Sequence, residues 1–129
     1  MQEMLKLPEV SEAMELLERA DVILHGIGTA TEMMKERRVS HSTQTKLIQA
    51  GAKGESFGAY YDLDGRCLME STNVGVDLAR LKPTCRMVAA AAGASKAEAI
   101  ISILRHTRHY LLVTDQGAAE RMLDILTNS

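Results

Sequence analysis

Residues 22–32 read Val-Ile-Leu-His-Gly-Ile-Gly-Thr-Ala-Thr-Glu, and this stretch decides the predicted fold. The apolar run 22–24, closed by glycines at 26 and 28, predicts a short buried strand followed by a turn. Thr29 and Glu32 then have the T-x-x-E spacing of a capping box. In that motif the threonine hydroxyl accepts from an early helix N–H, and the glutamate reaches back to the threonine N–H. A strand, a glycine turn and a capped helix together form the repeating unit of an α/β protein.

The last third of the chain repeats this pattern. Residues 86–90 are a second strand candidate, although alanine is a poor strand former. Ser95 and Glu98 have the S-x-x-E spacing of a second capping box, and a helix is expected to follow to about residue 105. Residues 110–113 predict a third strand, and Asp115 is expected to cap the final helix.

The middle of the chain has a different character. Residues 57–61 and 67–71 flank an Asp-Gly pair at 64–65, which is typical of a tight hairpin turn. Helical spacing of apolar residues predicts helices over 9–20 and, starting at Ser42, to about residue 49, where Gly51 and Gly54 end the helix. The predicted fold class is therefore α/β: a mostly parallel sheet with flanking helices and an inserted β-hairpin.

Composition limits the function. The 129 residues suit one ordinary domain, and 46% of them are apolar, which is enough for a packed core. Lys and Arg number 15 against 17 Asp and Glu, so the net charge is −2 and the chain lacks the basic excess of a nucleic-acid-binding protein. With no Trp, one Phe and three Tyr, it also lacks the aromatic residues that stack on single-stranded bases.

The sequence predicts a cytoplasmic protein without a membrane partner. Residues 1–7 lack the apolar core of a signal peptide, and no apolar run approaches the roughly 18 residues of a membrane span. Cys67 and Cys85 lie far apart and are expected to be buried, reduced thiols.

The first candidate site is an anion site at the carboxyl ends of the parallel strands, where ligands bind in open α/β sheets. Gly26 and Gly28 follow the first strand, and Gly93, Ser95 and Lys96 follow the second. Glycine allows a ligand close to the backbone, and helix N–H groups favour an anion. Lys96 at a helix start opposes the helix dipole, a conflict that a bound phosphate or carboxylate would remove. The alternative for Lys96 is a solvated surface lysine.

Three more charged residues are candidates. Arg37 and Arg38 end the predicted second helix, where they either complement the helix dipole or form a guanidinium fork for a phosphate or sugar hydroxyls. Glu55, at the mouth of the hairpin, is either an exposed loop acid or a ligand-binding carboxylate. His25 is expected to be a packed, hydrogen-bonded histidine.

Neither a cofactor nor a metal is expected. Residue Thr31 stands where the dinucleotide fingerprint G-x-G-x-x-G needs its last glycine, and the P-loop pattern is missing as well. His106 and His109 are spaced as H-x-x-H but lack a nearby third ligand or a catalytic glutamate.

Read in order, five blocks make the sequence resemble the sugar-binding domain of SorC-type bacterial transcriptional regulators, over about residues 8–126. These blocks are Ala20-Asp-Val-Ile-Leu-His-Gly-Ile-Gly28, Glu55-Ser-Phe-Gly-Ala-Tyr-Tyr61, Gly75-Val-Asp-Leu78, Ala94-Ser-Lys-Ala-Glu-Ala-Ile100 and Leu112-Val-Thr-Asp115. The resemblance implies a fold related to sugar-phosphate isomerases and glucosamine-phosphate deaminases. It implies sensing of a phosphorylated sugar, fructose 1,6-bisphosphate among the family's effectors, and not an enzyme.

The resemblance also implies roles for particular residues. Lys96 corresponds to a phosphate-contacting lysine, Glu55 to a glutamate that meets sugar hydroxyls, and either Arg37 or Arg38 to a ligand-contacting arginine. The sequence departs from the family where two glycines and a serine often precede the Ser-Lys pair, because residues 92–94 here read Ala-Gly-Ala.

The family's effector domain is roughly twice the length of this chain, a size that suits one large α/β domain. The resemblance therefore implies that residues 1–129 form the C-terminal portion of a sugar-phosphate effector-binding domain. DNA contact is then expected only through a helix-turn-helix domain absent from this chain, and a homo-oligomer is expected. Two alternatives remain open: a sugar-phosphate isomerase-like enzyme fragment, and a small interaction module that pairs through an exposed sheet edge.

Overall fold

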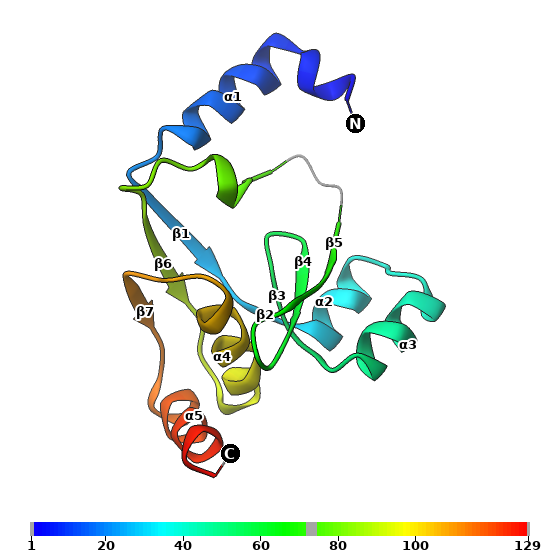
Figure 1. Ribbon diagram of the computed structural model, residues 1–129, viewed down its shortest axis with the longest axis vertical. Coiled ribbons are helices and arrows are strands. Elements are labelled where there is room, and N and C mark those ends of the chain that lie inside the picture. Colours follow the sequence, from blue (N-terminus) through cyan, green and yellow to red (C-terminus); the bar gives the residue numbers. More distant parts are fainter. Residues whose placement is uncertain (1, 72–74, 129) are drawn as a thin grey trace.

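The computed structural model describes residues 2–71 and 75–128, which form two sheets and the helices around them (Figure 1). The α-helices of this part are α1 (Pro8–Glu18), α2 (Ala30–Glu36), α3 (His41–Gln49), α4 (Ala97–His106) and α5 (Gln116–Thr127). Its strands are β1 (Val22–Gly26), β2 (Gly28–Thr29), β3 (Ala52–Ser56), β4 (Ala59–Asp62), β5 (Cys67–Glu70), β6 (Arg86–Ala90) and β7 (Leu111–Val113). Its short 3₁₀ turns are η1 (Met4–Lys6), η2 (Leu78–Arg80) and η3 (Ala94–Lys96).

The three predicted parallel strands form one sheet in the order β1-β6-β7. The register pairs Leu24 with Val88 and Val88 with Leu111. Helix α4 is the crossover between β6 and β7, which parallel strands require because a tight turn cannot join them. This confirms the predicted α/β class and its parallel sheet.

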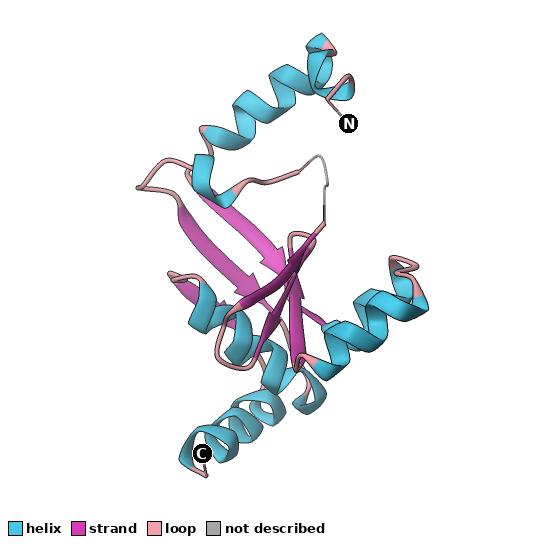
Figure 2. Ribbon diagram, turned by 45° about the vertical axis from the view of Figure 1, so that its right-hand side comes forward, coloured by secondary structure: helices cyan, strands magenta, loops and turns pink. Residues whose placement is uncertain are grey.

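The predicted hairpin belongs to a separate antiparallel sheet, with the order β2-β3-β4-β5 (Figure 2). Strands β4 and β5 pair as predicted, and Gly65 in the turn before β5 has a φ of +84°. Strands β2 and β3 were not predicted, because β2 has two residues and β3 reads Ala-Lys-Gly-Glu-Ser. Gly51, with a φ of +87°, ends α3 as predicted, whereas Gly54 lies inside β3. A Cβ on Gly54 would lie 2.9 Å from the carbonyl oxygen of Ala99, so this glycine lets β3 pack against α4.

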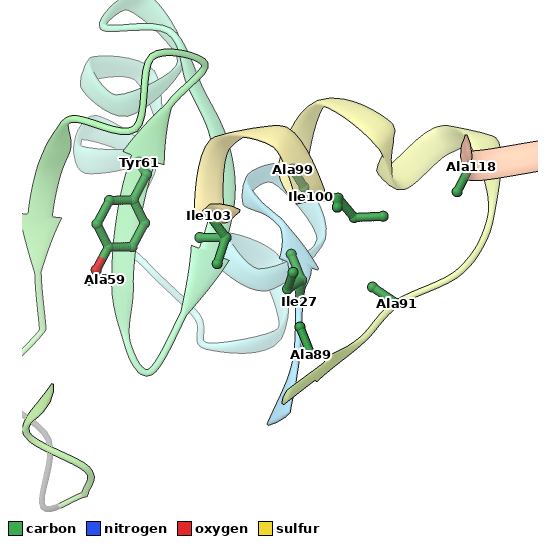
Figure 3. Close-up of a cluster of buried hydrophobic side chains, with 9 residues drawn as sticks. All are labelled: Ile27, Ala59, Tyr61, Ala89, Ala91, Ala99, Ile100, Ile103 and Ala118. Carbon is green, nitrogen blue, oxygen red and sulfur yellow. The ribbon is translucent and has the colours of Figure 1, made fainter. Parts of the chain in front are cut away.

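Helix α4 lies between the two sheets and forms the centre of the core (Figure 3). Its buried residues pack against alanines of β6 and the loop after it on one side, and against β4 on the other. Small side chains on β6 allow this close helix–sheet contact, which explains why an alanine-rich segment is a strand here. The cluster comprises Ile27, Ala59, Tyr61, Ala89, Ala91, Ala99, Ile100, Ile103 and Ala118.

One face of the parallel sheet is bare. Val22, Leu24, Leu111 and Val113 alternate with inward-facing residues and are between 48% and 70% exposed. Helix α1 extends away from the sheets, and none of its residues, all of them described, is buried (Figure 1). Parallel sheets normally bury both faces, so the exposure of these apolar side chains is unusual for such a sheet.

The two predicted capping boxes, at Thr29 and at Ser95, differ from the structure in detail. The Thr29 hydroxyl accepts from the Glu32 N–H at 3.3 Å as predicted, but it also donates to the Glu32 carboxylate, which does not reach the backbone. At the second box, the 3₁₀ turn η3 places Lys96, and not Ser95, at the N-cap of α4. Glu98 instead forms an ion pair with Lys53 of β3, at 3.1 Å.

Cys67 is exposed rather than buried, because β5 is an edge strand. Cys85 is partly buried, and both thiols are free. Among the residues described, there is no helix with the length and apolar character needed to cross a membrane.

Candidate functional site

A hollow of about 440 Å³ lies where β1 leaves the parallel sheet and the chain enters the antiparallel sheet at β2. It is formed by residues from five elements and the loops beside them: His25, Gly26, Ile27, Gly28, Met33, Arg37, Glu55, Ser56, Phe57 and Lys96. It is thus at the carboxyl end of a parallel strand, the position where ligands bind in α/β sheets. Five of the lining residues are ligand candidates named from the sequence: Gly26, Gly28, Arg37, Glu55 and Lys96.

Glu55 is the buried charge of this hollow. It lies in β3, opposite Gly28 of β2, and is only 4% exposed. One carboxylate oxygen, Oε1, accepts both the Gly58 N–H at 2.7 Å and the Arg37 guanidinium at 2.9 Å. The interpretation of Glu55 as an exposed loop acid was therefore wrong. Burial of a carboxylate is costly without such partners, so the two donors explain how Glu55 can be held inside.

The structure separates the two neighbouring arginines. Arg37 is the C-cap of α2, lines the hollow and is 37% exposed, so its guanidinium can serve Glu55 and a ligand together. Arg38 follows with a φ of +51°, which turns the chain out of the helix, and it is exposed. Within the described chain, only Arg37 of the two contributes to the lining of the hollow.

Lys96 is the second cation that lines the hollow. It ends η3 at the N-cap of α4, and its Nζ donates to the Ile27 carbonyl oxygen at 3.1 Å. This contact is partly buried and joins residues 69 positions apart. The lysine is therefore not a freely solvated surface residue, but neither is it paired with a carboxylate in any contact the described residues make.

The first glycine turn lies in the hollow. A Cβ on Gly28 would lie 2.3 Å from Met33 Cγ and 3.5 Å from Glu55 Oε2, so a side chain there would displace the lining. Gly26 has more room, with the nearest atom, the Ala90 carbonyl oxygen, at 3.9 Å. Gly26 is therefore open at this side, whereas the Met33 side chain covers the position that a Gly28 Cβ would take.

The second glycine turn lies outside the hollow. Gly93 has a φ of +101°, and its N–H donates to Asp115 Oδ1 at 3.1 Å. The same oxygen accepts from the Ala118 N–H at 2.9 Å, which confirms Asp115 as the cap of α5. Hydrogen bonds from Ala118 and Gly93 hold the pKa of Asp115 below its ordinary value. A carboxylate thus occupies this turn, and Ser95 beside it is exposed.

His25 is the lining residue whose neighbourhood the sequence did not predict. Its Nε2 lies 2.7 Å from His109 Nε2, and its Nδ1 lies 3.3 Å from Ser56 Oγ. Its ring also packs on Phe57, with centroids 4.7 Å apart. Burial, more than any charge, lowers the pKa of His25. The expectation of a packed, hydrogen-bonded histidine agrees with these contacts.

A second hollow of similar volume shares Phe57 with the first and is lined in part by Tyr61, Glu70, Asp77 and His106. It has acidic residues and no lysine or arginine in its lining as described, so it does not suit an anion. Over residues 2–71 and 75–128 there is no group of three His, Cys, Asp or Glu side chains that could hold a metal ion.

These features define a class of protein. An α/β domain whose parallel strand ends at a hollow with two cations and one buried carboxylate is a domain built to bind a small polar ligand.

Comparison with known proteins gives the family. The family model described as "Putative sugar-binding domain" matches residues 1–124, and the chain belongs to this family. It is 34% identical over 116 residues to the central glycolytic genes regulator of Bacillus subtilis, and 32% identical to that of Priestia megaterium. Among solved structures, a SorC family transcriptional regulator from Enterococcus faecalis has a TM-score of 0.86 at 31% identity, over 95% of this chain.

The chain is shorter than these relatives. The matches to the glycolytic regulators cover 90% of this chain but only 34% of each regulator. The match to the Enterococcus structure covers 50% of that chain. The full-length sorbitol operon regulator SorC from Klebsiella pneumoniae, with a TM-score of 0.78 at 19% identity, supports the fold alone.

Proposed function

We propose that this chain binds a phosphorylated sugar as the effector-binding portion of a bacterial transcriptional regulator, with fructose 1,6-bisphosphate as the first ligand to test. The observation that carries the proposal is the hollow in which buried Glu55, Arg37 and Lys96 face one space. A sugar phosphate needs an acceptor for its hydroxyls and cations for its phosphate, and the hollow offers both.

Glu55 and Arg37 form the sugar end. Only Oε1 of Glu55 is engaged by Arg37 and Gly58, which leaves Oε2 as the acceptor for a sugar hydroxyl. The guanidinium has five N–H donors and uses one toward Glu55, so others remain for ligand oxygens. A charged acceptor beside a charged donor suits a polyol, whose hydroxyls both donate and accept.

Lys96 and the glycine turn form the phosphate end. The Lys96 ammonium has three donors, and the Ile27 carbonyl takes one of them. Gly26, which lines the hollow and has open space where a Cβ would lie, allows a phosphate to approach the backbone beside it. This division matches the roles that the family resemblance implies for Lys96, Glu55 and the arginine.

The proposal is for binding and not for turnover. An isomerase needs a carboxylate free to take a proton from the sugar, with a pKa tuned for that transfer. Glu55 is instead held by the Gly58 N–H and the Arg37 guanidinium, and it is the one carboxylate among the described residues that line the hollow. The named relatives are regulators, which supports the same choice.

We also propose that residues 1–129 are the C-terminal portion of the effector domain and act in the cytoplasm, with DNA contact supplied by a different domain. Two observations support this: the chain spans half of the Enterococcus regulator, and the sheet face at Leu24 and Val113 is bare. Light scattering should show concentration-dependent association through this face, which Leu24→Lys should weaken. A monomer at all concentrations in both proteins would contradict the assignment of this face as an interface.

Titration calorimetry tests the ligand proposal. The chain should bind fructose 1,6-bisphosphate more tightly than fructose 6-phosphate, and unphosphorylated fructose should give no heat. Lys96→Ala should weaken binding at least tenfold, since it removes a charge from the phosphate end. Lys46→Ala, an exposed lysine of α3, is the matched control and should leave binding unchanged.

Two results would contradict the proposal. Equal binding by the Lys96→Ala and Lys46→Ala variants would remove Lys96 from the site. Interconversion of an aldose and a ketose phosphate above background would favour the enzyme alternative.

A further inference from the structure

His25, which lines the hollow, is hydrogen-bonded to His109, and the hydrogen bonds of the two rings allow their protons to be counted. The Nε2 atoms are 2.7 Å apart, so one proton must lie between them. His109 Nδ1 lies 2.7 Å from the Thr107 carbonyl oxygen, an acceptor, so this nitrogen also carries a proton. The protonation of the pair is therefore decided at the one remaining nitrogen, Nδ1 of His25.

His25 Nδ1 has two polar neighbours, which differ in the protonation state of Nδ1 that they allow. The Gly26 carbonyl oxygen at 2.9 Å can only accept, and it favours a protonated Nδ1. The Ser56 hydroxyl at 3.3 Å can either donate or accept. Two protonation states are thus compatible with the same geometry.

In the neutral state, Ser56 donates to His25 Nδ1, and His25 Nε2–H donates to His109. The ring nitrogens then hold two protons, and the Gly26 carbonyl faces a lone pair. In the charged state, a third proton on Nδ1 donates to Gly26 and to the Ser56 oxygen. The Ser56 O–H no longer donates to His25 and can point into the hollow, which Ser56 lines. Toward the ligand, Ser56 therefore offers only lone pairs in the neutral state and an O–H donor in the charged state.

We propose that the His25–His109 pair takes up a proton when an anionic ligand binds, and that the Ser56 hydroxyl then donates to a ligand oxygen. This inference rests on the proposed function, because it assigns a proton-linked regulation to the same hollow. A ligand phosphate accepts hydrogen bonds and carries negative charge, so it favours both the released donor and the added positive charge.

Other titratable and charged groups lie around the two histidines and influence their protonation. Glu55, Arg37 and Lys96 face His25 from the hollow. His106 and Tyr61 face the two imidazoles across a narrow gap on the other side. Without ligand, burial and the nearby His109 lower the pKa of His25, whereas the Gly26 carbonyl raises it. The lowered pKa disfavours the protonated form of His25 in the ligand-free protein, so a bound anion has a proton to recruit.

The first experiment needs no ligand. Titration of the histidine Cε1–H signals by NMR should show His25 and His109 changing together, because they share one proton. In His109→Gln the coupled behaviour of His25 should disappear, and in the control His41→Gln, on exposed α3, it should persist. Independent, uncoupled titration of the two rings in the unaltered protein would overturn the inference.

The second experiment measures the proton. Calorimetry with fructose 1,6-bisphosphate at pH 7, in buffers of different ionisation heat, counts the protons taken up on binding. His109→Gln should take up fewer protons than the unaltered protein and His41→Gln. The ligand's own ionisation is the same in all three proteins, so the difference belongs to the pair. Uptake of one proton makes the affinity rise by at most tenfold for each pH unit of acidification. Sulfate, which does not titrate here, should show the same trend.

A third variant, Ser56→Ala, tests the inference even if His109→Gln does not fold. Ser56→Ala removes the released donor, so its loss of affinity should be greater at pH 6 than at pH 8. A loss that is equal at both pH values would overturn the inference while leaving the proposed function intact. Failure of the unaltered protein to bind any sugar phosphate would overturn the proposed function as well, and the NMR titration would still report whether the pair shares a proton.

Discussion

Replacement of Glu55 by glutamine tests whether the buried carboxylate stabilises the fold as well as the ligand site. The change keeps the size of the side chain and removes its charge. Oε1 currently accepts from Gly58 at 2.7 Å and from Arg37 at 2.9 Å. Hydrogen bonds to a charged group contribute about 1.5–3 kcal/mol each, against about 0.5–1.5 kcal/mol for neutral pairs. The carbonyl oxygen of the new amide can still accept, so each bond is weakened and not lost.

The expected loss follows from how exposed each donor is. The Gly58 bond is buried, and its weakening should cost about 1 kcal/mol. The Arg37 guanidinium is 37% exposed, so water compensates for part of the lost ion pair and the cost is smaller. Glu55→Gln should therefore lower the free energy of unfolding by about 1–2 kcal/mol. Glu55→Ala should cost about 3 kcal/mol, because it also leaves the Gly58 N–H without its acceptor and opens a cavity.

Urea unfolding followed by circular dichroism measures this loss. Glu12→Gln is the control, an exposed acid of α1 whose replacement should change stability by less than about 0.5 kcal/mol. A double-mutant cycle with Arg37→Gln should show a coupling of about 0.5 kcal/mol, the smaller share expected for the half-exposed ion pair. If Glu55→Gln is as neutral as Glu12→Gln, or the coupling is zero, the buried ion pair is not the stabilising contact inferred here.

Three further predictions concern packing and buried hydroxyls. Gly54→Ala should destabilise the fold by about 1–3 kcal/mol, because its Cβ would lie 2.9 Å from the Ala99 carbonyl oxygen. The control Gly75→Ala has open space around its Cβ and should be neutral, and thermal unfolding of both variants checks this. Tyr60→Phe should be neutral or stabilise by up to about 1 kcal/mol, since the buried Tyr60 hydroxyl lacks a hydrogen-bond partner among the described residues, and a measurable loss in urea unfolding would reveal a partner. Tyr61 should ionise only near pH 12 in an ultraviolet titration, mainly because it is buried; its contribution to stability is complete below pH 10, the unfolded value, and is lost as the pH rises through 12.

The parallel sheet could be predicted because its signals are local. A β-branched run closed by glycines indicates β1, and Asp115 lies one position before the helix it caps. Strand β3 could not be predicted in this way. Its residues are polar or small, and it is a strand because β2, β4 and α4 surround it. The S-x-x-E spacing at Ser95 likewise predicts a helix cap only if Ser95 itself precedes the helix. In the structure Ser95 lies inside the 3₁₀ turn η3, so it cannot be the N-cap of α4.

For the site, the sequence by itself determined which residue types were available. It placed glycines at the end of β1, and it marked Lys96, Glu55 and the arginine pair as candidates. Which of these share a space was decided by tertiary structure, because the hollow joins segments from β1 to η3. Arg37 is separated from Arg38 by the turn at the end of α2, a backbone feature that spacing does not reveal.

The burial of Glu55 and the pairing of two histidines 84 residues apart have no local signal at all. The sequence determined the elements, since short-range sterics and hydrogen bonding act between near neighbours. The site depended on how two sheets and α4 pack, since burial and proton sharing are properties of groups that only the folded chain brings together.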